Sequence, residues 1–186
     1  MKTIRILSLH PTLDIDIHPD SALLLPGRPF FMPEWGEGWT AQLHPALKIG
    51  RLGKNIAPKF ASRYYDGLTL ALRVTLPDGN HSQGLLSGMD STLVIGEWMD
   101  TPCADSGLKV SVSSSASDGC SVSETVDVAP LRSVADEIIA GVSEYMTLKM
   151  GDVILLPPVG PSLPLNEGAR IDILADTRSI VTLRVV

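Results

Sequence analysis

Short runs of Val, Ile, Leu and Thr recur along the chain, and in many of them apolar and polar residues alternate. Alternation with a period of two is typical of strands, because successive side chains point to opposite faces of the sheet. The pattern predicts strands at residues 3–8, 13–18, 42–49, 68–76, 108–113, 122–128, 153–156, 170–174 and 179–186. Most of the regular structure should therefore be β.

The strands at 42–49 and 68–76 each carry polar residues on one face. Gln42 and His44 are two positions apart, so their side chains point the same way. In the second strand, apolar residues at every other position share one face, and Arg73 points to the opposite face. Arg73 is therefore predicted to lie on the polar side of a half-buried strand.

Two helices are predicted. Residues 58–65 follow Pro58, which suits the first helical position, and Gly67 should end this helix. Residues 133–146 place apolar side chains at helical spacing, with Ser133 as the expected N-cap. Together with the strands they predict one α+β domain, mainly β.

A serine-rich stretch separates the strands at 108–113 and 122–128. Its Asp118-Gly119 pair is typical of a tight hairpin turn. A flexible linker is the alternative. We favour the hairpin, because Val110 and Val112 alternate with polar residues as paired strands do.

Composition narrows the possible partners. The chain has 186 residues, 44% of them hydrophobic, and a formal net charge of -6. An acidic protein lacks the clustered cations that bind phosphate backbones, so no nucleic-acid partner is expected. No apolar run reaches the length of a signal peptide core or a membrane span, which predicts a cytoplasmic protein with no membrane partner. The two cysteines, Cys103 and Cys120, form no C-x-x-C pair and are expected to be reduced thiols.

Several segments resemble the fumarylacetoacetate hydrolase family. Residues 48–56 (KIGRLGKNI) are similar to its Ile-Gly-Lys and Gly-Lys-Asn segments, and residues 143–155 (SEYMTLKMGDVIL) to its Thr-Leu-x-x-Gly-Asp-Val-Ile strand. The resemblance spans residues 42–186 and is weaker over 1–41, the expected N-terminal strands and loop. It implies a mixed β-sheet roll with two short-to-medium helices, and a homodimer.

The resemblance also implies a metal site that these residues do not reproduce. Members of the family typically hold Mg²⁺ or Mn²⁺ with two glutamates and an aspartate, and act on 2-oxo or 1,3-diketo acids. The matching positions here are Gln42, His44 and Arg73, none of them a carboxylate. Because hard cations require anionic or carbonyl oxygens, no metal cofactor is expected. Ser87 stands where the family has a lysine, and Asp90 matches a family aspartate, so these five residues are the candidate cleft.

Three of these candidate residues have a second interpretation. Arg73 could grip a carboxylate with its bidentate fork, or simply pair with a nearby acidic side chain. Gln42 and His44 could serve a softer metal such as Zn²⁺ or Ni²⁺, although hydrogen-bonded residues lining an old cleft are the favoured interpretation.

Other acidic residues raise the question of displaced ligands. An alternating set near the N-terminus could line up on one strand face, but we favour a solvated strand edge. This set is Asp14, Asp16, His18 and Asp20. Glu34 and Glu37, in the loop at 26–39, are likewise expected to be solvated.

The sequence therefore leaves two functions open. The first is a member of the family resembling hydrolases, isomerases and decarboxylases of oxo acids, with metal-dependent activity altered or lost, a pseudoenzyme in the extreme case. The second is a non-catalytic protein that binds a small carboxylate or oxo acid, or serves as a dimer partner, through the same cleft. Neither a Gly-x-Ser-x-Gly nucleophile elbow nor a phosphate-binding glycine loop is present.

Overall fold

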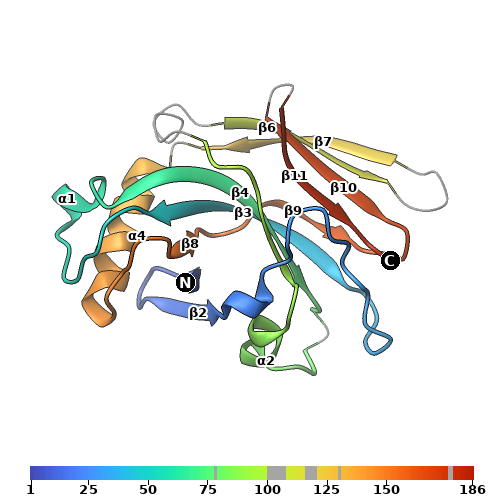
Figure 1. The fold of residues 1–186 in the computed structure, drawn as a ribbon, viewed down its shortest axis with the longest axis horizontal. Coiled ribbons are helices and arrows are strands. Elements are labelled where there is room, and N and C mark those ends of the chain that lie inside the picture. Colours follow the sequence, from blue (N-terminus) through green and yellow to red (C-terminus); the bar gives the residue numbers. More distant parts are fainter. Residues whose placement is uncertain (78, 100–107, 116–120, 130, 176–177) are drawn as a thin grey trace.

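A mixed seven-stranded sheet is the centre of the molecule (Figure 1). The computed structural model describes residues 1–77, 79–99, 108–115, 121–129, 131–175 and 178–186. The sheet has the order β2-β1-β8-β3-β4-β5, with β9 paired to β3, and only β1 and β8 run parallel within it. Its strands are β1 (Thr3–Ser8), β2 (Asp14–His18), β3 (Thr40–Ile49), β4 (Tyr65–Thr75), β5 (Leu93–Ile95), β8 (Val153–Leu155) and β9 (Val159–Pro164).

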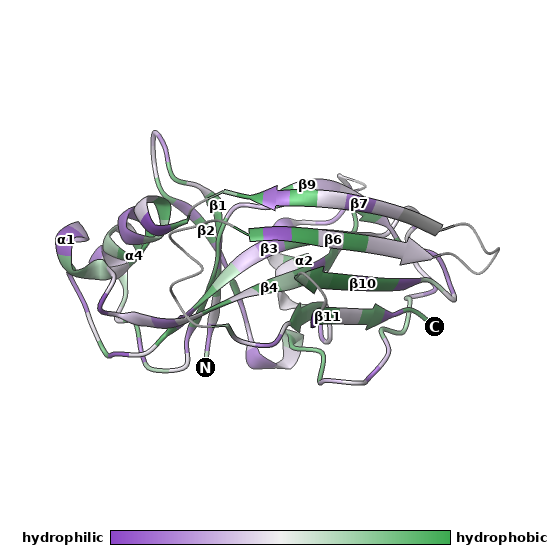
Figure 2. Cartoon of the chain, turned by 90° about the horizontal axis from the view of Figure 1, so that it is seen from above, coloured by the Kyte–Doolittle hydropathy of each residue, from purple (hydrophilic) through white to green (hydrophobic). Residues whose placement is uncertain are grey.

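A four-stranded antiparallel sheet, in the order β11-β10-β6-β7, lies across β3 and β4 (Figures 1 and 2). Its strands are β6 (Leu108–Ser115), β7 (Ser121–Val128), β10 (Arg170–Ala175) and β11 (Arg178–Arg184). The continuous pairing of β6 with β7 confirms the hairpin and rejects the linker. The predicted turn residues Asp118 and Gly119, and both cysteines, lie outside the described residues.

The apolar face of the long strands β3 and β4 is shared between two neighbours. Near the start of β3, Leu43 packs against the four-stranded sheet, in a core that includes Ile171 and Leu183. Toward its end, Leu47 packs against Ile138 of α4 (Arg132–Tyr145). Within the described residues, no helix is both long enough and apolar enough to cross a membrane.

The helices differ from the prediction in detail. α1 (Pro58–Ala61) begins at Pro58 as expected but ends early, because Tyr65 already pairs with Ile49 as the first residue of β4. α4 begins after Leu131, so Ser133 is inside the helix and is not its N-cap. The short helix α2 (Gln83–Gly88), capped by Ser82, was not predicted. The α+β, mainly β class is confirmed.

The opposite face of the sheet is covered by a different set of segments. α2 and the 3₁₀ helix η1 (Asp20–Ala22) pack beside β2, and Leu23 forms a bridge with Leu93 of β5. In Figure 1 these segments lie below β3 and β4, on the side away from the four-stranded sheet. Because β1 and β2 join the same sheet as β3, the N-terminal residues help to build this face. The proposed division at residue 42 stays a prediction.

Candidate functional site

Strand register gathers polar residues on the face covered by α2. Gln42 of β3 is directly opposite Arg73 of β4, and Arg5 of β1 is directly opposite Asp16 of β2. Directly opposed residues share a face, and so do residues two positions apart. The polar cluster defined in this way consists of Arg5, Asp16, His18, His44 and Arg73 from the sheet, with Gln83 and Ser87 from α2.

Asp16 is the only carboxylate in the polar cluster. It accepts hydrogen bonds from Arg5 and from the Ser87 hydroxyl, the latter at 2.9 Å. Burial alone would raise the pKa of Asp16, but these hydrogen bonds and the charges of Arg5 and Arg73 bring that pKa below its usual value. Asp16 is therefore ionised at neutral pH and already engaged.

Gln83 joins the two arginines. Its side-chain oxygen accepts from Nη2 of Arg5 at 3.1 Å and from Nη2 of Arg73 at 3.3 Å. Arg73 is only 1% exposed, and burial together with the Arg5 charge lowers its pKa to about 10. It remains a cation at neutral pH. Within the described protein, the Nε atoms of Arg5 and Arg73 have no hydrogen-bond partner.

His44 is held in one orientation by the backbone of the segment after β8. Its Nδ1 lies 2.8 Å from the Leu156 carbonyl oxygen, and the side chain is fully buried. Burial lowers the pKa of His44 to about 4, and the charges of Arg5 and Arg73 act in the same direction. Its Nε2 atom has no partner among the described residues.

His18 is also fully buried, at the end of β2. Neither ring nitrogen has a partner in hydrogen-bonding geometry among the residues that the structure describes. Burial, followed by the charges of Arg73 and Arg5, lowers its pKa to about 4 despite the nearby Asp16. The polar cluster thus holds two cations, one anion and two neutral imidazoles.

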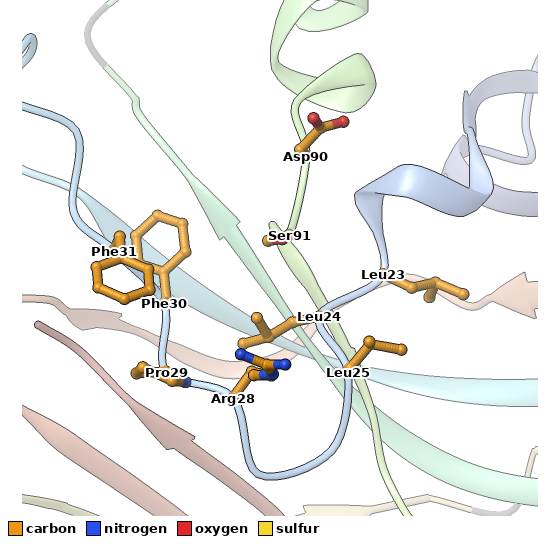
Figure 3. Close-up of a pocket in the computed structure, with 9 residues that line it drawn as sticks. All are labelled: Leu23, Leu24, Leu25, Arg28, Pro29, Phe30, Phe31, Asp90 and Ser91. Carbon is orange, nitrogen blue, oxygen red and sulfur yellow. The ribbon is translucent and has the colours of Figure 1, made fainter.

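The structure brings three of the five predicted cleft residues together and separates one. His44, Arg73 and Ser87 belong to the polar cluster, and Gln42 lies half-buried at its border, opposite Arg73. Asp90 is exposed and lines a different pocket of about 470 Å³ (Figure 3). That pocket is built mainly by the segment at 23–31.

Two interpretations from the sequence are wrong. Arg73 was expected on a half-buried strand, but β4 is buried on both faces, because α2 and the N-terminal segments cover its polar side. Asp16 and His18 are not on a solvated edge: the Asp16 side chain is 12% exposed and His18 is 0% exposed. Asp14 and Asp20 are exposed, as expected for an edge.

Sequence reasoning missed two members of the polar cluster. Arg5 alternates with Ile4 and Ile6 in a short apolar strand, and this lone charge was an available signal. The sequence carries no comparable signal for Gln83, because its contact with the two arginines depends on where α2 packs. Glu34 and Glu37, considered as displaced ligands, are both exposed.

The donor set does not suit Mg²⁺ or Mn²⁺. These cations require several oxygen ligands, whereas the polar cluster offers one carboxylate that Arg5 and Ser87 already hold. Two guanidinium groups would repel a cation there. Throughout the described ranges, no group of three or more His, Cys, Asp or Glu residues could hold a metal ion.

Comparison with known proteins gives a family match over nearly the whole chain. The family model described as fumarylacetoacetate (FAA) hydrolase, C-terminal, matches residues 10–185. A curated relative from Escherichia coli, the homoprotocatechuate catabolism bifunctional isomerase/decarboxylase, is 24% identical over 163 residues. The match covers 86% of this chain but 36% of that protein, so the chain spans about a third of its length.

Solved structures share the fold. The 5-carboxymethyl-2-hydroxymuconate delta-isomerase from Mycobacterium smegmatis aligns with a TM-score of 0.83 and 21% identity, covering all of this chain and 78% of that one. The 2-hydroxyhepta-2,4-diene-1,7-dioate isomerase from Mycobacterium marinum aligns with a TM-score of 0.80 and 20% identity, and 73% of its chain is covered. The maleylpyruvate hydrolase from Sphingobium sp. SYK-6 aligns with a TM-score of 0.78 and 20% identity, and 70% of its chain is covered. Each alignment covers 100% of this chain.

Proposed function

Because this chain belongs to the fumarylacetoacetate hydrolase family, we propose that it binds a small organic acid at the polar cluster, with Arg5 and Arg73 holding the carboxylate directly. The family's relatives include isomerases, hydrolases and a decarboxylase. The names of two of them, a dioate isomerase and a maleylpyruvate hydrolase, are those of enzymes that act on organic acids. Here the acid is recognised by fixed cations, and metal-dependent chemistry is lost.

One observation carries the proposal. A single neutral oxygen, that of Gln83, accepts hydrogen bonds from two buried guanidinium groups. A guanidinium–carboxylate contact combines hydrogen bonding with the attraction of opposite charges and is frequently bidentate, whereas a neutral amide oxygen offers no countercharge. A carboxylate oxygen at the Gln83 position would therefore be held more tightly than the amide oxygen.

The charges of the polar cluster favour an anion. Arg5 and Arg73 supply two positive charges and Asp16 one negative charge, so one positive charge is left uncompensated. Burying an unpaired charge is costly, and Arg73 has only the 3.3 Å contact to Gln83 among its described hydrogen bonds. A bound carboxylate supplies the missing countercharge and acceptors for the unpartnered Nε atoms.

A route to the polar cluster leads past Gln83. Arg73, His18 and His44 are all buried, whereas Gln83, in the first turn of α2, is an exposed residue. Rotation of the Gln83 side chain away from the arginines would uncover the two Nη2 atoms that it contacts. We therefore propose that the acid replaces the Gln83 amide on binding.

Titration calorimetry and melting curves in the presence of a chelator test this function. Acetate, propionate, lactate and pyruvate are the probes, and we expect at least one of them to bind and to raise the melting temperature without metal. Arg73→Met should abolish the response. Arg178→Gln is the matched control, because Arg178 forms an exposed ion pair with Glu97. Binding that requires Mg²⁺ or Mn²⁺, or metal-dependent turnover of an oxo acid, would overturn the proposal.

A further inference from the structure

Building on the proposed function, we infer that the polar cluster selects a 2-hydroxy acid over the matching 2-oxo acid, because His44 Nε2 accepts a hydrogen bond from the ligand's hydroxyl group. The carboxylate lies between Arg5 and Arg73, and the hydroxyl on the next carbon faces His44. This specificity is the reverse of that of a metal site, which chelates a carboxylate and a carbonyl oxygen together.

The tautomer of His44 is fixed by its backbone partner. A carbonyl oxygen only accepts hydrogen bonds, so Nδ1 of His44, 2.8 Å from the Leu156 oxygen, carries the proton and donates it. A neutral imidazole has one proton on its two nitrogens, and Nε2 is therefore an acceptor. Nε2 is buried and has no partner among the described residues, so it needs a donor.

The surroundings keep His44 neutral. The groups that face the polar cluster are Arg5 from β1, Asp16 and His18 from β2, and Arg73 from β4, while α2 has no ionisable side chain. Lys48, on the same face of β3, instead lies 6.0 Å from the Trp98 ring. With two cations and one anion nearby, a further positive charge on His44 is opposed.

The requirement for a donor separates two ligands of nearly equal shape. Lactate and pyruvate carry the same carboxylate. On the next carbon, lactate has a hydroxyl, which can donate a hydrogen bond, and pyruvate has a carbonyl, which only accepts one. A carbonyl oxygen cannot satisfy the Nε2 lone pair and repels it at close approach, while a hydroxyl satisfies Nε2. Propionate, with neither group, should rank between them.

Calorimetry with the unmodified chain and a chelator at pH 7.5 gives the test. We expect lactate to bind about tenfold tighter than pyruvate, with propionate in between. Equal affinities, or tighter binding of pyruvate, would overturn this inference and leave the proposed function standing. If none of the three binds but acetate does, this inference alone fails; if acetate does not bind either, the proposed function itself fails.

Two further measurements identify the role of His44. His44→Leu, a substitution of similar volume, should bring the lactate and pyruvate affinities together, whereas substitution of the exposed His10 by Leu should preserve the difference. The binding enthalpy of lactate should be the same in buffers of different ionisation enthalpy, because His44 accepts without becoming charged. Uptake of a proton on binding would show a protonated imidazole and overturn the inference. If His44→Leu does not fold, the ranking by the wild-type chain still decides.

Discussion

Arg5 and Arg73 donate to the same oxygen of Gln83, although β8 and β3 separate their strands in the sheet. In register with Arg5 are Leu155 of β8 and Ala46 of β3, which are apolar or small, while Arg73 lies four residues along β4 from the position opposite Ala46. Like charges so placed repel, which lowers the pKa of Arg73 in addition to the effect of burial. The shared contact with Gln83 therefore brings two positive charges close together. We expect this arrangement to lower the stability of the unliganded fold and to favour the binding of an anion at the polar cluster.

Arg73→Met should stabilise the unliganded protein. The variant removes a buried cation that has one long hydrogen bond, and it keeps a side chain of similar length in the same space. Replacing a buried ion pair by apolar groups is often neutral or stabilising by about 1–4 kcal/mol, and a buried cation without an ion-pair partner has less to offset its desolvation. Urea unfolding should show a higher midpoint at unchanged slope. A lower midpoint would mean that Arg73 makes a net favourable contribution to the unliganded fold.

Arg5→Met should have the opposite effect. Asp16 would lose its guanidinium partner while its side chain stays largely buried, at 12% exposure. Removing one member of a buried ion pair costs about 3–5 kcal/mol, because the other charge remains uncompensated. Adding Asp16→Asn should recover a large part of this loss in a double-mutant cycle. Additive effects of the two substitutions would contradict a direct interaction.

The alternation of apolar and polar residues along each strand predicted part of the polar cluster. The other members are brought there by tertiary packing, which the alternation does not show. The period of two placed Gln42, His44 and Arg73 on one side, and the register of β3 and β4 confirms that arrangement. Alternation cannot tell a solvated strand edge from one covered by a distant helix. Asp16 was therefore misread, because the covering residue Ser87 is 71 positions away along the chain.

The fold was more predictable than the site for a related reason. Strand identity follows from short stretches of sequence, so most strands were found, and the family resemblance supplied their arrangement. β5 and α2 were missed because each is very short, at 3 and 6 residues, and β9 was missed because glycine and proline residues interrupt its pattern. Gln83 lies on the missed helix, and its contact with both arginines could not be inferred without it.

Stability should fall as the pH drops from about 6.5 to 4. Burial lowers the pKa of His18 and of His44 from 6.5 to about 4, so in this range the unfolded chain binds protons that the folded chain does not. At 1.36 kcal/mol for each unit, the loss approaches about 3 kcal/mol per histidine. Urea unfolding at several pH values measures it.

Single substitutions assign this pH dependence to the two histidines. His44→Leu should reduce the slope of stability against pH between 4 and 6.5 by about half. His10→Leu is the matched control, in which a histidine is replaced at an exposed position outside the polar cluster. An unaltered slope in His44→Leu would show that other groups cause the acid sensitivity.

Gln83→Ala should strengthen acid binding. The substitution removes the neutral oxygen that competes with the ligand for both Nη2 atoms, and it costs the unliganded protein about 1 kcal/mol in lost hydrogen bonds. We expect affinity for the best probe acid to rise by about threefold to tenfold in calorimetry. Leu85→Ala is the matched control, since Leu85 is an exposed residue of the same helix. Weaker binding by Gln83→Ala alone would mean that Gln83 contacts the ligand or holds the arginines in place, and that the acid does not replace it.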